Sequence, residues 1–291
     1  MLKTWVVEDG SPYQILASFE SLLERKHLGR KKLVTTHSTI GLVAEWPEVS
    51  RVLGFFSKAS KPLGDSRVYR RITGGPPIDL REGGSYAAIV GEYPWSLRSL
   101  YKDLKPLMEC FDEKGFHGGA SRDGETVIGL TKLAKAPSGV LVEVLTNKPL
   151  EELVECLSKY YGGVESVGSI DPDLVPTKAA DRLRSPEWLR LESRSYNIES
   201  VSANDEGFYV RFTAWVEEEL IHWMEVEGNF YAYPPAHVLA IVGNVSQVPP
   251  SPGLEYEFLA AWSSFIDVAG INFEDVERAF RELLRKAGGD F

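Results

Sequence analysis

Apolar residues recur along the chain with spacings that predict both strands and helices. Short apolar runs predict strands at residues 38–45, 66–71 and 85–93. Apolar side chains three or four positions apart predict amphipathic helices at residues 97–113 and 149–161. The chain is therefore expected to fold in the α/β class, as a mixture of strands and helices of the α+β type.

The first helix is predicted from its start signal. Ser11 suits an N-cap, and Pro12 suits the first helical position. Another helix is predicted at residues 47–57, between two of the strands, and Pro106 is expected to bend the helix at 97–113. The apolar stripe of the first helix consists of Leu16, Phe19, Leu22 and Leu23.

Two long apolar runs follow, joined by a short turn. ETVIGLTKLA and GVLVEVLT are separated by KAPS, which predicts a β-hairpin with proline in its turn. The helix at 149–161 precedes Gly162 and Gly163, as a helix before a C-terminal glycine cap does. Residues 168–187 then contain three prolines and no strong period, which indicates a domain boundary.

Beyond this break the pattern predicts a small sheet followed by helices. The expected strands are NIESVSA, FYVRFTAWV and the continuation ELIHWMEVEGNFYAYP. Helices are expected near residues 235–242, 255–268 and 273–286. We therefore predict a first domain at residues 1–180 and a smaller α+β domain at residues 181–291.

The segment YRRITGGPPID at residues 69–79 is the main candidate for chemistry. Arginines ahead of a glycine turn can hold an anion between guanidinium groups and open backbone N–H groups. The two glycines permit positive φ and close approach of a ligand, whereas the two prolines have no N–H to donate. The ligand-binding residues predicted from this loop are Arg70, Arg71, Thr73, Gly74, Gly75 and Pro76.

Structural interpretations of the same features stay open. Either arginine can form a surface ion pair, and the glycines can form a plain hairpin turn. His117–Gly119 suits a surface loop, and His222 suits a structural histidine in a strand. Three tryptophans of the second domain suit its core: Trp215, Trp223 and Trp262. No set of His, Cys, Asp and Glu has metal-ligand spacing, so no metal site is predicted.

Composition narrows the class of protein. Of 291 residues, 43% are hydrophobic and 25% charged, the balance of a soluble globular protein. The net charge of −10 argues against nucleic-acid binding, which needs a basic face, and is interpreted as an aid to solubility. No run suits a membrane span and the N-terminus lacks the pattern of a secretion signal, so we expect a cytoplasmic protein without a membrane partner.

The two cysteines lie in different segments. Cys110 is in the helix predicted at 97–113, and Cys156 is on the helix predicted at 149–161. Each is interpreted as a core or boundary thiol, because their spacing fits no metal site. Thioester chemistry at either thiol stays open.

With these elements in order, the chain resembles the lipoate–protein ligase family, which is related to biotin protein ligases. The family's RRxTGGGAVYHD loop matches RRITGGPPIDL at Arg70–Leu80. Two further motifs follow in the family's order, SPEWL at Ser185–Leu189 and VEGNFYAYP at Val226–Pro234. The resemblance covers nearly the whole chain and implies a mixed-sheet ligase-like domain followed by the family's accessory domain.

The resemblance also implies chemistry. In the family, ATP and lipoate or octanoate form an acyl-adenylate, and the acyl group then passes to a lysine of a carrier domain. Preorganised cations must neutralise the phosphate and acyl oxygens where charge develops. The resemblance therefore implies ATP and lipoate or octanoate as ligands and a lipoyl-carrier domain or a small acyl ligand as partner.

The chain departs from the family at the position of its essential lysine. DGETVIG at Asp123–Gly129 stands where the family has DGRKxSG, which places Thr126 at the lysine position. A hydroxyl carries no charge toward a developing oxyanion. Lys132 is the candidate substitute, although it lies about 20 Å away by strand rise unless a bulge or shifted register intervenes.

Three functions remain open at this point. The chain is a divergent ligase or acyltransferase, a non-catalytic relative that binds a lipoyl-type ligand or a carrier domain, or a scaffold that has lost the small-molecule site. For the first, Arg70 is the expected phosphate or carboxylate clamp, and Thr126 and Lys132 are uncertain polar contacts. Further losses around the loop and at Glu143, which adds negative charge, favour a pseudoenzyme over an active enzyme.

Overall fold

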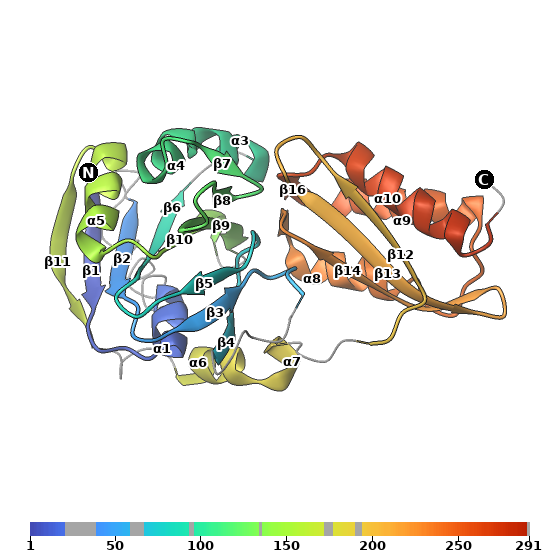
Figure 1. The fold of residues 1–291 in the computed structure, drawn as a ribbon, viewed down its shortest axis with the longest axis horizontal. Coiled ribbons are helices and arrows are strands. Elements are labelled where there is room, and N and C mark those ends of the chain that lie inside the picture. The colour runs from blue at the N-terminus through green and yellow to red at the C-terminus, as the bar shows by residue number, and fades with distance from the viewer. Residues whose placement is uncertain are drawn as a thin grey trace.

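The structure is a computed structural model, which describes residues 1–20, 39–58, 67–92, 96–133, 136–171, 177–189 and 194–289. Its largest element is an eight-stranded mixed sheet in the order β11-β1-β2-β6-β10-β9-β8-β7 (Figure 1). The strands in this order are β11 (Val164–Ile170), β1 (Leu2–Val7), β2 (Ile40–Glu45), β6 (Ser85–Glu92), β10 (Ala136–Thr146), β9 (Thr126–Leu133), β8 (Ala120–Ser121) and β7 (Phe116–His117). The strands expected at 38–45 and 85–93 and the hairpin β9–β10 are confirmed.

A second, three-stranded sheet lies beside it in the order β4-β3-β5. These strands are β4 (Arg67–Arg70), β3 (Ser50–Leu53) and β5 (Ile78–Leu80). The helix expected at 47–57 is wrong, because its centre is β3. Val52 pairs with both Tyr69 and Ile78 and is fully buried, so pairing on both sides decides its conformation.

Short helices cover the sheets of this first part (Figure 1). They are α1 (Pro12–Ala17), α3 (Leu97–Asp103), α4 (Lys105–Phe111), α5 (Leu150–Tyr161), α6 (Thr177–Arg184) and α7 (Pro186–Leu189). Ser11 is the N-cap of α1, and Gly162 closes α5 in the left-handed conformation, both as expected. The helix expected at 97–113 divides into α3 and α4 at Leu104, next to Pro106. Leu22 and Leu23 of the predicted first stripe lie outside the described residues.

The second part is the predicted small sheet with helices. The sheet has the order β12-β13-β14, and its helices are α8, α9 and α10 (Figure 1). The bounds are β12 (Ile198–Ala203), β13 (Tyr209–Glu217), β14 (Leu220–Gly228), β15 (Tyr231–Tyr233), α8 (Pro235–Gly243), α9 (Pro252–Phe265), β16 (Asp267–Ala269) and α10 (Phe273–Lys286). Helix α10 packs on β12 and β13, and α8 packs on β14. The mixed α+β class is confirmed.

One apolar core cluster contains residues from both parts. Phe56 of the first part stacks on Phe230 of the second with ring centroids 4.6 Å apart. The backbone N–H of Gly228 donates to the carbonyl of Phe56 at 3.0 Å. The motif VEGNFYAYP therefore lies at the junction of the two parts. The division at residues 180 and 181 remains a prediction.

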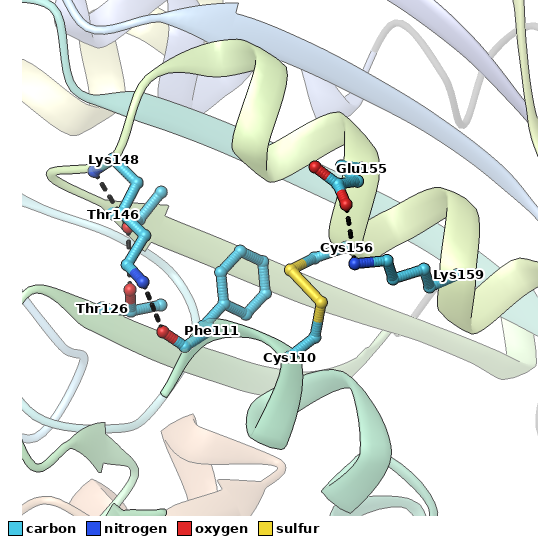
Figure 2. The surroundings of a disulfide bond; sticks show 8 residues. All are labelled: Cys110, Phe111, Thr126, Thr146, Lys148, Glu155, Cys156 and Lys159. Atoms are coloured by element: carbon cyan, nitrogen blue, oxygen red, sulfur yellow. Dashed lines mark hydrogen bonds and ion pairs between the residues drawn. A yellow bond between two sulfur atoms is a disulfide. The ribbon is translucent and has the colours of Figure 1, made fainter. Parts of the chain in front are cut away.

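The interpretation of the cysteines as separate thiols is wrong. Cys110 of α4 and Cys156 of α5 form a disulfide with their Cα atoms 5.6 Å apart (Figure 2). Neither cysteine is therefore a thiol, and the thioester chemistry that the sequence left open has no nucleophile here. The two helices pack against each other, which sequence spacing could not reveal.

Among the described residues, the helices are too short or too polar to cross a lipid bilayer. The cytoplasmic location remains a prediction. Disulfides such as Cys110–Cys156 persist mainly in oxidising compartments, with intracellular proteins of hyperthermophiles as an exception.

Candidate functional site: the arginine–glycine loop

The arginine–glycine loop, residues 70–77, connects β4 to β5. Arg70 ends β4, and Gly75 takes a φ of 101°, a conformation that suits glycine. Both arginines and Thr73 are at most 2% exposed. The two arginines are therefore not surface ion pairs; they lie in the interior of the protein.

Arg70 is held by main-chain carbonyls. Its Nη1 donates to the carbonyls of Gly54, Phe55 and Ser57 at 2.8, 3.0 and 2.8 Å. Its Nε and Nη2 donate to the carbonyl of Leu189 at 3.2 and 3.0 Å. These contacts tie β4 to the segment after β3 and to α7.

The motif SPEWL contacts Arg70 through two of its residues. The indole Nε1 of Trp188 donates to the carbonyl of Arg70 at 2.8 Å. The carbonyl of Leu189 accepts from Arg70 across a sequence separation of 119 residues. The sequence predicted only the order of the two motifs, and the structure brings them into contact.

Arg71 binds its own loop. Its Nε donates to Thr73 Oγ1 at 2.9 Å, and its Nη2 donates to the carbonyls of Gly74 and Pro76 at 3.1 and 2.9 Å. Its Nη1 is buried and has no hydrogen-bond partner among the described residues. A buried donor without an acceptor costs about 1–3 kcal/mol, so this atom is an unusual feature of the loop.

A buried carboxylate lies below the loop. Glu143, at the centre of β10, accepts from Thr73 Oγ1 at 2.5 Å and from the Tyr86 hydroxyl at 2.6 Å. Burial raises the pKa of Glu143, while the charge of Arg71 and the two hydrogen bonds oppose that rise. Burial also lowers the pKa of Arg71, against the opposing charge of Glu143. The negative charge that the sequence analysis placed near the loop is thus part of its hydrogen-bond network.

The second part of the chain occupies the space beside the two glycines. A Cβ on Gly74 would lie 2.4 Å from the carbonyl oxygen of Phe230, and a Cβ on Gly75 would lie 3.1 Å from Cε1 of Tyr231. The N–H of Gly75 donates to Phe230 and the N–H of Gly74 donates to Leu130, each at 3.3 Å. The close approach that glycine permits is made here by protein backbone.

The turn at His117–Gly119 packs at the same junction. The carbonyl of Gly118 accepts from the side chain of Asn229 at 3.1 Å. A Cβ on Gly119 would lie 2.5 Å from the hydroxyl of Tyr231. His117 is exposed, as the predicted surface loop requires, whereas Gly118 and Gly119 are buried at the junction.

Thr126, at the family's lysine position, is fully buried and paired. Its hydroxyl lies 2.7 Å from the hydroxyl of Thr146 (Figure 2). The nearby Lys148 directs its ammonium to the carbonyl of Phe111 at 2.5 Å. Neither contact places a positive charge on the arginine–glycine loop.

Lys132 remains at the far end of the same strand. Pairing of β9 with β10 is regular from Thr126 to Lys132, without the bulge that would bring this lysine closer. Its ammonium forms an ion pair with Asp267 of β16 and lies 6.0 Å from the centroid of the Tyr233 ring. Lys132 therefore contacts the second part of the chain in this conformation.

An open cleft of about 680 Å³ lies at the edge of the first part and was not predicted from the sequence. Tyr69 donates to Glu48 there, and Glu48 forms an ion pair with Arg67 at 3.5 Å. Burial and the hydrogen bond to Glu48 raise the pKa of Tyr69. The lining residues are Asp9, Gly10, Ser11, Pro12, Tyr13, Gln14, Pro47, Glu48, Arg67, Tyr69 and Arg184. Its charges come from two acids and two arginines, so it selects for no single sign of ligand.

Metal-ligating side chains do not gather anywhere in the part of the chain that the structure describes. The loop likewise offers few donors for the phosphates of ATP. Its glycine N–H groups face carbonyls, its prolines have none, and most donors of its arginines are engaged. The residues present do not fit an ATP phosphate in this conformation.

Comparison with known proteins gives a fold but no close relative. No protein-family model matches the sequence, and no curated protein sequence matches it. Among solved structures, P. falciparum LipL1 in complex with lipoate superposes with a TM-score of 0.64 at 10% identity, covering 99% of this chain and 100% of that one.

Two further structures match the chain more loosely and over a smaller share of its length. Protein Ta0514 of T. acidophilum with bound lipoic acid has a TM-score of 0.45 at 12% identity, over 65% of this chain and 98% of that one. Lipoate-protein ligase A bound with ATP has a TM-score of 0.46 at 10% identity, over 65% of this chain and 99% of that one. The chain has the lipoate–protein ligase-like fold, as the resemblance implied.

Proposed function

We propose that this protein is a lipoate–protein ligase-like protein that binds a lipoyl or octanoyl group without forming the acyl-adenylate. The acyl group is either free, as lipoate or octanoate, or carried on the lysine of a carrier domain. In this proposal the chain is a non-catalytic relative of the ligases, and ATP is not its ligand.

The observation that carries the binding proposal is the Nη1 atom of Arg71. It is a buried, charged donor without an acceptor among the described residues, and it belongs to the second arginine of the RRITGG motif. A carboxylate or amide oxygen at the head of an acyl chain is an acceptor that would satisfy it. The likeness in fold to a protein in complex with lipoate supports the same class of ligand.

The absence of adenylation is proposed from the cations. Adenylation requires positive charge at the phosphate and acyl oxygens in the transition state. Thr126 stands at the lysine position and bonds Thr146, while Lys132 is paired with Asp267. The guanidinium of Arg70 donates hydrogen bonds to four main-chain carbonyls.

Mass spectrometry separates binding from transfer. The protein is incubated with ATP, octanoate or lipoate, and a lipoyl-carrier domain, and the carrier is then weighed. We expect no gain in carrier mass. A gain that disappears in Thr126→Ala or Lys132→Ala would overturn the non-catalytic proposal and support an active ligase or acyltransferase.

Thermal unfolding tests the binding itself. We expect lipoate, or a carrier domain that already bears a lipoyl group, to raise the melting temperature, and ATP to add nothing. The two arms distinguish the free acid from the carrier-bound amide. Arg71→Lys should abolish the shift because an ammonium lacks the forked donors. The control is Arg51→Lys, which alters a partly buried arginine that pairs with Asp79 on the same small sheet.

The outcomes of the thermal-unfolding test distinguish between the remaining functions. A ligand-induced shift that persists in Arg71→Lys would contradict the assignment of Arg71. The lack of any shift with the free acid and with the lipoylated carrier would contradict binding altogether. In that case the chain would be a scaffold that keeps only the fold.

A further inference from the structure

The acidity of the protein is concentrated in one segment. Residues 212–277 contain eleven Asp or Glu residues and no Lys or Arg, so all 32 basic residues of the chain lie outside it. The net charge of this segment is −11 and that of the remainder is +1, which together give the −10 of the whole chain. A distribution of this kind exceeds what solubility requires, because solubility depends on net charge and not on its location.

The segment includes an uncovered face of the small sheet. Helices α8 and α10 pack on the face that buries Val210, Phe212 and Ala214. Side chains on the opposite face alternate with these and are partly exposed. We call this opposite face the acidic sheet face and define it by Val201, Arg211, Trp215, Glu217 and Trp223.

Aromatic and acidic side chains are neighbours on this face. Trp215 of β13 is the direct cross-strand partner of Trp223 of β14, and Glu225 is the partner of Thr213. The Trp215 Nε1 donates to Glu217 at 3.3 Å. On β12, Val201 is 55% exposed and adds apolar surface.

The protein's own cations already bind the rings of this region. The guanidinium of Arg194 lies 5.9 Å from the centroid of the Trp223 ring. The guanidinium of Arg211 lies 5.5 Å from the centroid of the Tyr196 ring, and the ammonium of Lys58 lies 5.0 Å from it. Arg211 is neutralised by Glu199 and Glu227, so it does not cancel the charge toward the hairpin tip. The face thus favours cations over aromatic rings beside carboxylates.

The tip of the β13–β14 hairpin is also acidic. Glu218 and Glu219 turn the chain between β13 and β14 with φ values of 52° and 61°, where glycine or asparagine would be favoured. Together with Glu217 they place three exposed carboxylates in succession. Glu218 and Glu219 therefore keep their charge in a backbone conformation that is unfavourable for glutamate.

We propose that the acidic sheet face is a docking surface for a protein segment rich in lysine and arginine. Its basic side chains would lie over the ring of Trp215 and pair with the carboxylates of the hairpin. Charge complementarity selects this occupant, because no described helix covers the face and the carboxylates of Glu217, Glu218 and Glu219 at its tip are exposed. The proposal does not depend on the acyl-binding function.

A titration with synthetic peptides tests the proposal on the full chain. The probe is a peptide of alternating lysine and alanine, and the comparison is a peptide of alternating glutamate and alanine. At physiological ionic strength we expect saturable binding of the first only, with a change in tryptophan fluorescence. Isothermal titration calorimetry gives the affinity.

Matched variants locate the binding. Glu217→Lys with Glu219→Lys should weaken binding by about tenfold or more, because two attractive charges become repulsive. Trp215→Leu should weaken it about threefold or more through the lost ring. The control is Glu257→Lys with Glu274→Lys, which changes net charge equally but lies on α9 and α10, the helices of the opposite side.

Three results would overturn the proposal. The first is no binding of the lysine peptide to the wild-type protein. The second is an equal loss in the control pair, which would mean diffuse attraction to an acidic protein and no docking face. The third is unchanged affinity in the hairpin pair. Circular dichroism and the melting temperature of each variant show that the fold is retained.

Discussion

Two charged regions of this molecule use charge in opposite ways. The arginine–glycine loop is buried, and the donors of Arg70 and most of those of Arg71 bind carbonyl and hydroxyl oxygens of the protein itself. The acidic sheet face is exposed, and its carboxylates lie in a segment without a single basic residue.

The difference shows that a sequence motif does not by itself establish an activity. Arginines and glycines in the right order are necessary for an anion site, but their donors must also point at an empty space. In the loop the space beside the glycines is occupied by Phe230 and Tyr231, and Nη1 of Arg71 is the arginine donor that has no partner among the described residues. At the tip of the sheet face the carboxylates of Glu217, Glu218 and Glu219 are exposed, although no sequence motif marks them. Variants that alter one region and not the other test this contrast.

The largest effect is expected from removing the second arginine of the loop. Arg71→Met leaves the carbonyls of Gly74 and Pro76 without a donor and Glu143 without its nearby cation. We expect the free energy of unfolding to fall by about 3–5 kcal/mol, measured by chemical denaturation. Adding Glu143→Leu should restore part of the loss. If Arg71→Met proves neutral, the loop's charge is not structural and the comparison fails.

Removal of the disulfide should also cause a large loss of stability, at a position outside the arginine–glycine loop. Replacing both Cys110 and Cys156 by alanine opens a loop with a sequence separation of 46 and should lower the free energy of unfolding by about 3 kcal/mol. No hydrogen bond of the arginine–glycine loop involves either residue, so lipoate binding by the folded variant should persist. A loss of binding in folded protein would show that the loop depends on the α4–α5 contact.

Glu143 should make the stability of the loop depend on pH. Burial raises its pKa in the folded state above its unfolded value, so its contribution is present at low pH and is lost as pH rises through the folded pKa. Relative to wild type, Glu143→Gln should therefore gain stability as pH rises from acid values toward neutrality. Denaturation curves across that range give the difference. A constant difference would mean that Glu143 does not titrate there.

The smallest effect is expected on the acidic face. Glu219→Gly relieves a positive φ at the hairpin tip and should raise the free energy of unfolding by about 0.5–1 kcal/mol. Its control, Glu257→Gly within α9, should lower it by about 1 kcal/mol because glycine weakens a helix interior. If Glu219→Gly destabilises the protein, then the hairpin carboxylate makes a structural contact that the proposal does not allow for.

The arginine–glycine loop shows where sequence reasoning succeeded and where it stopped. It identified the loop, the strand before it, the hairpin β9–β10 and the caps of α1 and α5, because each follows from residues within a few positions. It gave a helix where β3 lies, because pairing with β4 and β5 overrides local preference. The roles of the predicted ligand-binding residues remain predictions.

The sequence by itself determined the alternation of strands and helices, the order of three motifs and the acidic composition, since these depend on neighbours along the chain. Only the tertiary structure decided that Arg70 binds the carbonyl of Leu189, that Gly74 faces Phe230 and that Cys110 bonds Cys156. Those partners are 46 or more residues apart in the sequence, and a chain that size brings such residues together only when its core is packed.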